Sequence, residues 1–488
     1  MVNEQHFSNL IYEYFLLRFE FGFYQFGDVL PPVETFCREF SVAENTVKIA
    51  LRRLRTEGYI DMRGGRSTTV LFKQTELKRQ DFISSYFSKR WDAYADLYAS
   101  SELIFIPLLL EGLRRMSKDD LDSMAHLAEQ AGGDDLLHFS CLILKKINNP
   151  LAMNLFWETL FFLGFPFAGR KTRPTQYTAE TVQKRLKTLI SGAKSQSWDM
   201  VHDALIEFQR CDYSNVANYL NKNVPHLPKE DQFLFTWRIY RDHPQICYNL
   251  SAHILHEIYI GNYRGKKFLP SYSATAKHYG VSVSTVRRTI TTLNQIGAVQ
   301  PINGKGVRIC PIGEPCKPVD FSDATIRRNL SFYVQSFDLI RYTCEGVTHA
   351  FVSTFTPSVQ RELIERLENE LFSGHCIVSI FHFFCSIIKN EQMHMVSEVY
   401  RIIYSLFLWG APLKGSTGKT PALEQAAELF TKRMLQYLKK NDADGCAATV
   451  KVFIDDQAAA AEKFLLQQGI CLEELRLSPS IRFLVAKN

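Results

Sequence analysis

Two stretches of the chain place hydroxyl, amide and cationic side chains at the spacing of one helix face. "SVAENTVKIALRR" runs from Ser41 to Arg53, and "GVSVSTVRRTITT" runs from Gly280 to Thr292. Short polar side chains at the start of a helix allow close approach to phosphates and base edges. An arginine in the first turn can donate two hydrogen bonds to guanine. These residue types therefore point to binding of duplex DNA.

Each stretch is expected to form a helix with one apolar and one polar face. The expected buried stripes are Val47, Ala50, Leu51 and Leu54 in the earlier stretch and Val286, Ile290 and Leu293 in the later one. The expected outer faces are Asn45, Lys48 and Arg52, and Ser284, Arg287, Arg288 and Thr291. Ser282 is placed to cap the later helix. Because the short helical segment "SYSATAKHY" precedes it across a tight turn, the pattern predicts a helix-turn-helix.

A hairpin is predicted after each of these helices. Past Gly297, "AVQPI" and "VRI" flank Asn303-Gly304, and Asn-Gly between apolar residues is the strongest short hairpin signal. This hairpin carries Lys305 at its tip. The earlier hairpin turns at Gly64-Gly65 between Arg63 and Arg66. We interpret both hairpins as basic wings that contact the DNA backbone or the minor groove.

The two segments are copies of one another at a constant offset. Thr46 aligns with Thr285, a separation of 239 residues (285 − 46). The same offset pairs Gly22 with Gly261, Tyr24 with Tyr263, Leu30 with Leu269, Pro31 with Pro270, Leu54 with Leu293, Gly58 with Gly297 and Gly65 with Gly304. A helical pattern follows each copy, so we interpret the chain as a fused and diverged duplication.

The repeated segment resembles the winged helix-turn-helix of GntR-family transcription regulators. The resemblance rests on "LPPVETFCREFSVAENTVKIALRRLRTEGYI" with "RGGRSTTV", and on "LPSYSATAKHYGVSVSTVRRTITTLNQIGAV" with "NGKGVRI". It implies a mainly α fold, in which two winged domains of three helices plus a β-hairpin wing are each followed by an all-α bundle. The implied domains are 1–75, 80–230, 240–315 and 322–484, in that order.

The resemblance also implies DNA contacts, which fall on the helix start and the wing of each copy. Family contact positions include Ala43, Glu44, Val283, Gly64 and Asn303. Together with the outer faces, the expected DNA-binding set is Asn45, Thr46, Lys48, Arg52, Arg63, Gly65, Arg66, Ser282, Ser284, Thr285, Arg287, Arg288, Gly304 and Lys305.

The two copies depart from the family pattern to different degrees. Glu34 and Ser273 stand where the family often has an arginine, and so do Glu44 and Val283. A carboxylate near phosphate is repulsive, so we expect the second copy to be the stronger reader of bases.

The helical segments resemble the effector domain of the FadR branch of this family. Many members bind a metal there through one aspartate and three histidines, but here the aligned positions are Leu136, Ser140, Val201 and Asn223. Asp134, His138, His202 and His226 lie nearby but out of frame, so no metal or other cofactor is expected. The aromatic run Phe156, Trp157, Phe161, Phe162, Phe165 and Phe167 is interpreted as core, with the lining of an effector pocket as the alternative.

Bulk properties leave this interpretation intact and exclude others. A chain of 488 residues is too long to fold around a single hydrophobic core. Its net charge of +6 is mild, so overall charge alone does not indicate a nucleic-acid partner. The eleven cysteines form no Cys-x-x-Cys pair and indicate a reducing cytoplasm with inert thiols. No apolar run reaches the length of a membrane span, and no hydrolase elbow or dinucleotide fingerprint predicts an enzyme.

The sequence therefore predicts a cytoplasmic DNA-binding transcription regulator in which one polypeptide supplies both halves of a pseudo-dimer. A small-molecule effector of unknown identity would act through the helical domains. Two alternatives stay open: a winged-helix scaffold that touches only protein, and a homodimer of the fused chain that presents four readers.

Overall fold

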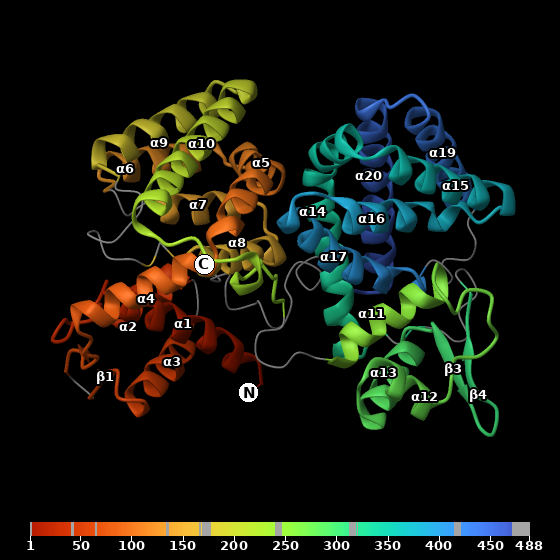
Figure 1. Ribbon diagram of the computed structural model, residues 1–488, viewed down its shortest axis with the longest axis horizontal. Helices are drawn as coiled ribbons and strands as arrows, with labels where there is room; N and C mark the ends of the chain where they lie inside the picture. Colours follow the sequence, from red (N-terminus) through yellow and green to blue (C-terminus); the bar gives the residue numbers. More distant parts are fainter. Residues whose placement is uncertain are drawn as a thin grey trace. The chain divides into compact units, whose positions relative to one another are not determined.

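The computed structural model describes residues 2–40, 43–63, 66–132, 136–164, 167, 177–239, 246–311, 319, 321–413 and 421–470. The chain forms two compact units, Met1–Asp242 and His243–Gln392 with Val396–Ser478. Each unit holds three helices with a β-hairpin, followed by a group of helices (Figure 1). The predicted fold class is confirmed.

The first winged domain is built from α1 (Val2–Glu20), α2 (Val33–Phe40), α3 (Glu44–Thr56), β1 (Ile60–Asp61) and β2 (Thr69–Val70). Strands β1 and β2 pair antiparallel with Ile60 opposite Val70, and Val29 forms a further bridge to Thr69. Helix α3 buries the predicted stripe of Val47, Ala50, Leu51 and Leu54. Since apolar residues three and four apart face one side of a helix, the polar side of α3 is left at the surface.

The second winged domain repeats this plan with α11 (Ile246–Tyr259), α12 (Tyr272–Tyr279), α13 (Val283–Gln295), β3 (Val299–Ile302) and β4 (Gly306–Ile309). Strands β3 and β4 pair antiparallel over four residues each, with Val299 opposite Ile309 (Figure 1). Helix α13 buries the predicted Val286, Ile290 and Leu293.

The structure keeps the register of the duplication. The bounds of α2 and α3, shifted by 239 residues, are those of α12 and α13. The bridge between Val29 and Thr69 likewise becomes the bridge between Phe268 and Arg308. The same backbone therefore presents both recognition helices, and the differences between them lie in their side chains.

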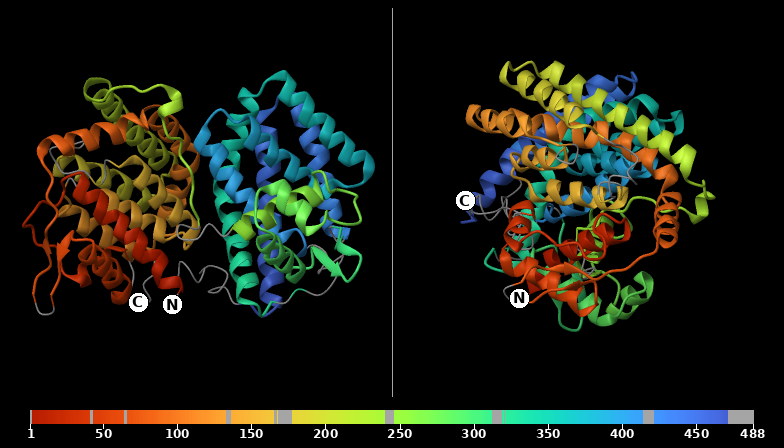
Figure 2. Two further views of the ribbon diagram at one scale, coloured as in Figure 1. Left: turned by 60° about the horizontal axis from the view of Figure 1, so that its bottom comes forward. Right: turned by 90° about the vertical axis from the view of Figure 1, so that its left-hand side faces the viewer.

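A group of helices follows the winged domain in the first half. They are α4 (Glu76–Ser88), α5 (Trp91–Arg114), α6 (Lys118–Glu129), α7 (Leu136–Lys145), α8 (Pro150–Leu163), α9 (Ala179–Lys194), α10 (Trp198–Asn223) and the 3-10 turn η2 (Lys229–Asp231). Helices α9 and α10 lie side by side (Figures 1 and 2). Helices α5, α6, α7, α9 and α10 share one hydrophobic core, and Ile106, Met124, Leu186 and Val201 bring α5, α6, α9 and α10 into it.

The helices of the second half are centred on two long helices packed along each other. The elements are α14 (Ala324–Thr354), α15 (Pro357–Ser373), η3 (Cys376–Val378), α16 (Ser379–Asn390), α17 (His394–Phe407), η4 (Leu408–Gly410), α19 (Pro421–Leu438) and α20 (Ala443–Gln467). Helices α14 and α20 form the central pair (Figure 2).

Two expectations from the sequence, on membrane spans and on the cysteines, are compared here with the structure. Helix α5 is, by length and composition, apolar enough to cross a membrane, although no single run of its sequence suggested this. Its buried Ile104, Ile106 and Leu108 lie in the interior of the first unit, which accounts for their apolar character. Cys310 is disulfide-bonded, so the expectation of thiols throughout is wrong at that position, while the eight other cysteines described are free.

Candidate nucleic-acid interface

The start of α13 is fixed by a hydroxyl cap. The Ser282 Oγ accepts a hydrogen bond from the Thr285 backbone N–H at 3.1 Å, as predicted, and lies 2.8 Å from the hydroxyls of both Ser284 and Thr285. Gly280 ends α12 with a φ of 64°, in the left-handed region that favours glycine. The turn and the cap together hold three hydroxyl groups at the amino-terminal end of the recognition helix.

The outer face of α13 is exposed and cationic. Ser284, Arg287, Arg288 and Thr291 are exposed, as the sequence predicted. Within the described parts of the chain, neither Arg287 nor Arg288 has a carboxylate at ion-pair distance, because the residue one turn before Arg287 is Val283. Both guanidinium groups therefore keep their donors for an external acceptor, such as a base edge or a phosphate.

The wing of the second domain ends in an exposed turn. Asn303, Gly304 and Lys305 connect β3 to β4, and all three are exposed. Gly304 and Gly306 have φ values of 74° and 106°, which a side chain would strain. The hairpin thus presents Lys305 at its tip, as expected.

The start of α3 differs from that of α13. Ala43 occupies the cap position and provides no side-chain hydrogen bond. Glu44 forms an ion pair with Lys48 at 2.6 Å, so the cation that corresponds to Arg287 already has an anionic partner. The side chain of Thr46 is completely buried on the core side of the helix, and its DNA contact stays a prediction. Asn45 and Arg52 remain exposed.

The first wing is shorter and partly neutralised. Its strands have two residues each, and Gly64 and Gly65 lie outside the described residues. Arg63 is ion-paired with Asp61 at 3.1 Å, whereas Arg66 is exposed and has no carboxylate partner among the residues described. Arg66 is therefore the wing cation that remains available.

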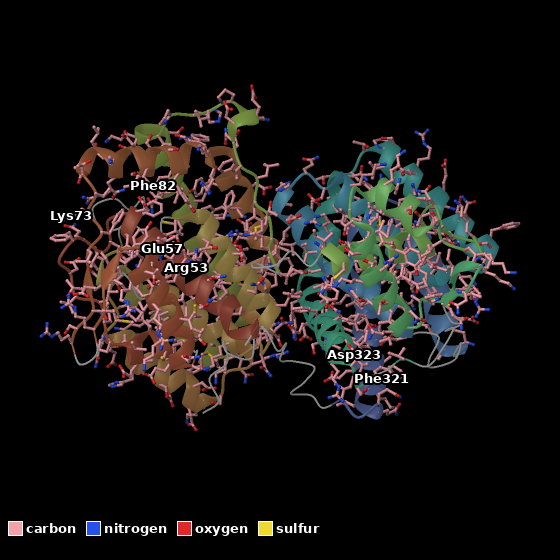
Figure 3. All side chains as sticks on the ribbon, turned by 90° about the horizontal axis from the view of Figure 1, so that it is seen from below. Arg53, Glu57, Lys73, Phe82, Phe321 and Asp323 are labelled. Carbon is pink, nitrogen blue, oxygen red and sulfur yellow. The ribbon has the colours of Figure 1, made fainter. Side chains whose placement is uncertain are left out.

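The first recognition helix is anchored to α1 by contacts at its carboxyl-terminal end. Arg53 lies over the ring of Tyr12 at 3.7 Å and is ion-paired with Glu57 at 3.0 Å. Figure 3 labels Arg53 on α3 and Glu57 directly after its end. The Tyr12 hydroxyl also donates to Glu57. Burial and this hydrogen bond raise the pKa of Tyr12 to about 12, so the phenol remains a donor. These contacts occupy Arg53, and we leave it out of the DNA-facing set.

The second winged domain is joined to its helices by polar contacts that the sequence did not reveal. Gln295, the last residue of α13, donates to Asp323 at 3.0 Å, and Asp323 also accepts from the Ile326 N–H at the start of α14. Asp323 is labelled in Figure 3. Arg264, which follows α11, makes a two-pronged hydrogen bond to Glu370 of α15. The partners in these two contacts are 28 and 106 residues apart in the sequence, so no local sequence pattern predicts the contacts.

Glu370 is the centre of the larger of these contacts. Its side chain is 5% exposed and also accepts a hydrogen bond from His382 Nε2 at 2.9 Å. Burial raises the pKa of Glu370, but the hydrogen bonds from Arg264 and His382 outweigh it and lower the pKa to about 2. The buried carboxylate is thus held ionised between two donors.

The positions considered for a metal are occupied in other ways. Asp212 is ion-paired with Arg185 at 2.8 Å, and His226 Nε2 lies 2.7 Å from Asp92. His202 lies beside Asp203, His138 is exposed, and Asp134 is outside the described residues. The part of the chain that the structure describes holds no group of three metal-binding side chains.

Comparison with known proteins agrees with this geometry. The family model "Bacterial regulatory proteins, gntR family" matches residues 11–70 and 249–309, one match on each winged domain. No curated protein matches the chain.

Three solved structures are similar to this chain at low identity. Streptococcus agalactiae GntR is 14% identical, with 44% of this chain and 99% of that chain covered and a TM-score of 0.20. A structure titled "Lar controls the expression of the Listeria monocytogenes agr system and mediates virulence" is 14% identical. The match covers 46% of this chain and 99% of that chain, with a TM-score of 0.21. E. coli McbR/YncC is 17% identical, and the match covers 45% of this chain and 98% of that chain, with a TM-score of 0.24.

Proposed function

We propose that this chain, a GntR-type DNA-binding transcription regulator with two helix-turn-helix domains in tandem, recognises a specific operator as a single-chain pseudo-dimer. The observation that carries the proposal is the pair of recognition helices at one offset, each with a polar exposed face and a wing cation beside it. A protein-only scaffold would not need cations at both the helix face and the wing tip.

The second winged domain is proposed as the main reader of bases. Ser284, Arg287 and Arg288 would enter the major groove, and Lys305 would contact the backbone or the minor groove. The capped helix start supports this assignment, because it holds the polar side chains in place before DNA arrives.

The first winged domain is proposed as the weaker reader. Asn45, Lys48 and Arg52 would face the groove and Arg66 the backbone, with Lys48 partly neutralised by Glu44. Since the two faces differ chemically, we propose an operator with unlike half-sites rather than a palindrome. Because the proposed target is chromosomal DNA, we place the protein in the cytoplasm.

Titration of DNA at several salt concentrations tests the proposal. The intact chain is titrated into labelled duplex taken from the DNA that flanks its own gene, and the dissociation constant is followed by fluorescence anisotropy. The logarithm of the association constant should fall linearly with the logarithm of salt concentration, with a slope of about −0.9 for each phosphate contacted. An absence of binding to any duplex at low salt would overturn the proposal.

A further inference from the structure

A cavity of about 440 Å³ lies between the first winged domain and the helices that follow it. Helix α1 contributes Glu13, Leu16 and Leu17, while α4 and α8 contribute the opposite walls. Its volume falls in the range of small-molecule sites. Everything that lines it belongs to the first unit.

The remaining wall is an extended segment with alternating side chains. Phe235, Trp237 and Ile239 are buried, and Trp237 donates to Asn154 at 2.8 Å, which fixes the segment against α8. The intervening Leu234, Thr236 and Arg238 line the cavity. Since side chains of an extended chain alternate between two faces, the buried set forces the other set toward the cavity.

Arg90, which lies between α4 and α5, is the charge in this cavity for which the described residues provide no counter-ion. Its guanidinium lies 3.7 Å from the centre of the Tyr86 ring and 5.2 Å from that of Phe162, and Nη1 donates to the Tyr86 carbonyl at 3.0 Å. Its Nε is buried without a hydrogen-bond partner, and no carboxylate pairs with it among the described residues. A guanidinium without a counter-ion favours an incoming anion, which would reach its Nη groups from the cavity rather than the covered Nε.

The other charges of the cavity compensate one another. Arg238 donates to Glu158 at 3.2 Å and lies 3.9 Å from Glu13. Glu158 is almost completely buried, so water screens its ion pair with Arg238 only weakly. These acidic groups do not neutralise Arg90 and would repel an anion at their end of the cavity. The cavity therefore offers a ligand one cationic end, beside Arg90. Its middle is apolar and is lined by Leu17, Phe162 and Leu234.

We propose that this cavity binds a small monocarboxylate with an apolar body. The carboxylate accepts two hydrogen bonds from Arg90, whose planar fork matches that geometry, and the body packs between Leu17, Phe162 and Leu234. The aromatic run of the sequence thereby divides between two roles: Trp157 and Phe167 belong to the core, and Phe161 and Phe162 line the site.

The position of the cavity links ligand binding to the first recognition helix. Helix α1 forms one wall and packs against α3 through Tyr12, Arg53 and Glu57. A ligand that contacts both α1 and α8 stabilises one arrangement of the winged domain on its helices. The effect on DNA binding rests on the proposed function, whereas carboxylate binding does not.

Calorimetric titration of the full chain tests the binding. The probes are benzoate, 4-phenylbutyrate and octanoate, each compared with its neutral amide. At least one carboxylate should bind at least tenfold more tightly than its amide, and Arg90→Met should remove that difference. Arg114→Met is the matched control, because Arg114 also lies near an aromatic ring, that of Trp198 at 5.4 Å, but outside the cavity.

A second variant guards against a folding defect in Arg90→Met. Leu17→Trp fills the cavity without changing its charge, and it should abolish carboxylate binding while the thermal unfolding curve remains cooperative. Equal binding of acids and amides, retention of binding in both variants, or no binding of any probe at its solubility limit would overturn the proposal.

The DNA titration is then repeated with the best carboxylate at saturation. A change of about fivefold or more in the dissociation constant, absent in Arg90→Met, supports the link to the winged domain. Carboxylate binding with unchanged DNA affinity would overturn that link alone. Failure to bind DNA under either condition would overturn the proposed function and leave the carboxylate site standing.

Discussion

The recognition helices α3 and α13 have the same length and the same place in their domains, but their amino-terminal turns differ. Helix α13 begins with a serine cap and carries Arg287, which has no carboxylate partner among the described residues, whereas α3 begins with Ala43 and pairs Lys48 with Glu44. A duplicated backbone thus holds one cation ready for an external partner and another engaged by its neighbour. Fusion into one chain permits this divergence, because the two domains no longer share one sequence.

The attachment of each winged domain to its own helices differs as well. In the first unit Phe21 packs against Phe82, Tyr86 and Phe87, with ring centres 5.1 to 5.8 Å apart. In the second unit the corresponding attachment includes the partly exposed Arg264 with the buried Glu370 and His382. An aromatic contact responds little to pH or salt, whereas a buried ion pair depends on the charge of each member.

The largest effect is expected from Glu370→Gln, which removes the charge that holds Arg264. We expect the free energy of unfolding of the second unit to fall by about 2–3 kcal/mol. This is below the roughly 3–5 kcal/mol of a fully buried pair, because the Arg264 side chain is 35% exposed. Urea denaturation followed by circular dichroism measures the change. Glu362→Gln, which removes an exposed ion pair with Arg366, is the control and should change stability little.

The same group predicts a pH dependence. The pKa of Glu370 is about 2 in the folded chain, below its ordinary 4.5, so its stabilisation is complete above pH 4.5 and is lost as the pH falls toward 2. The difference in unfolding free energy between wild type and Glu370→Gln should therefore shrink between pH 5 and pH 3. A constant difference over that range would contradict the assignment of an ionised Glu370.

The next largest effect concerns DNA. Arg287→Ala should weaken binding to the operator by about 1–3 kcal/mol and relax specificity in one half-site. Lys48→Ala, its counterpart in α3, should have a smaller effect, because Lys48 is already paired with Glu44. Competition titrations with operators mutated in one half-site at a time measure both. Equal losses in the two variants would remove the distinction between the recognition helices.

A smaller effect is expected from the helix caps. Ser282→Ala should lower the stability of the second winged domain by about 1 kcal/mol, since the Thr285 N–H loses its acceptor. Ala43→Ser places the same hydroxyl at the uncapped start of α3 and should stabilise the first winged domain by a similar or smaller amount. The melting temperatures of both variants, measured by thermal unfolding, compare the contributions of the two helix caps to stability.

The smallest effect is expected from the wing cations. Lys305→Ala and Arg66→Ala should weaken binding to all duplexes alike and reduce the steepness of the salt dependence by about 0.9 each. Arg63→Ala should change it less, because Arg63 is paired with Asp61. A loss restricted to one DNA sequence would instead indicate that the wing reads bases.

Periodicity and local spacing predicted what lies close together in the sequence. The buried stripes of both recognition helices, the cap at Ser282 and the 239-residue register all follow from such patterns. The burial of the Thr46 side chain was not predicted, because residue type and family position do not report the rotation of α3 against its core. The Arg264–Glu370 contact and the cavity beside Arg90 join distant segments, so they depend on packing that no local pattern records.

The central claim is that one chain carries two unlike readers for one site. Selection of the intact protein on random duplexes, followed by the mass of the resulting complex, tests it most directly. We predict one chain per duplex and a selected site with two unlike half-sites about one or more helical turns apart. Arg287→Ala should reduce the sequence specificity of only one of these half-sites. A palindromic site occupied by two chains that use the same recognition helix would contradict the account.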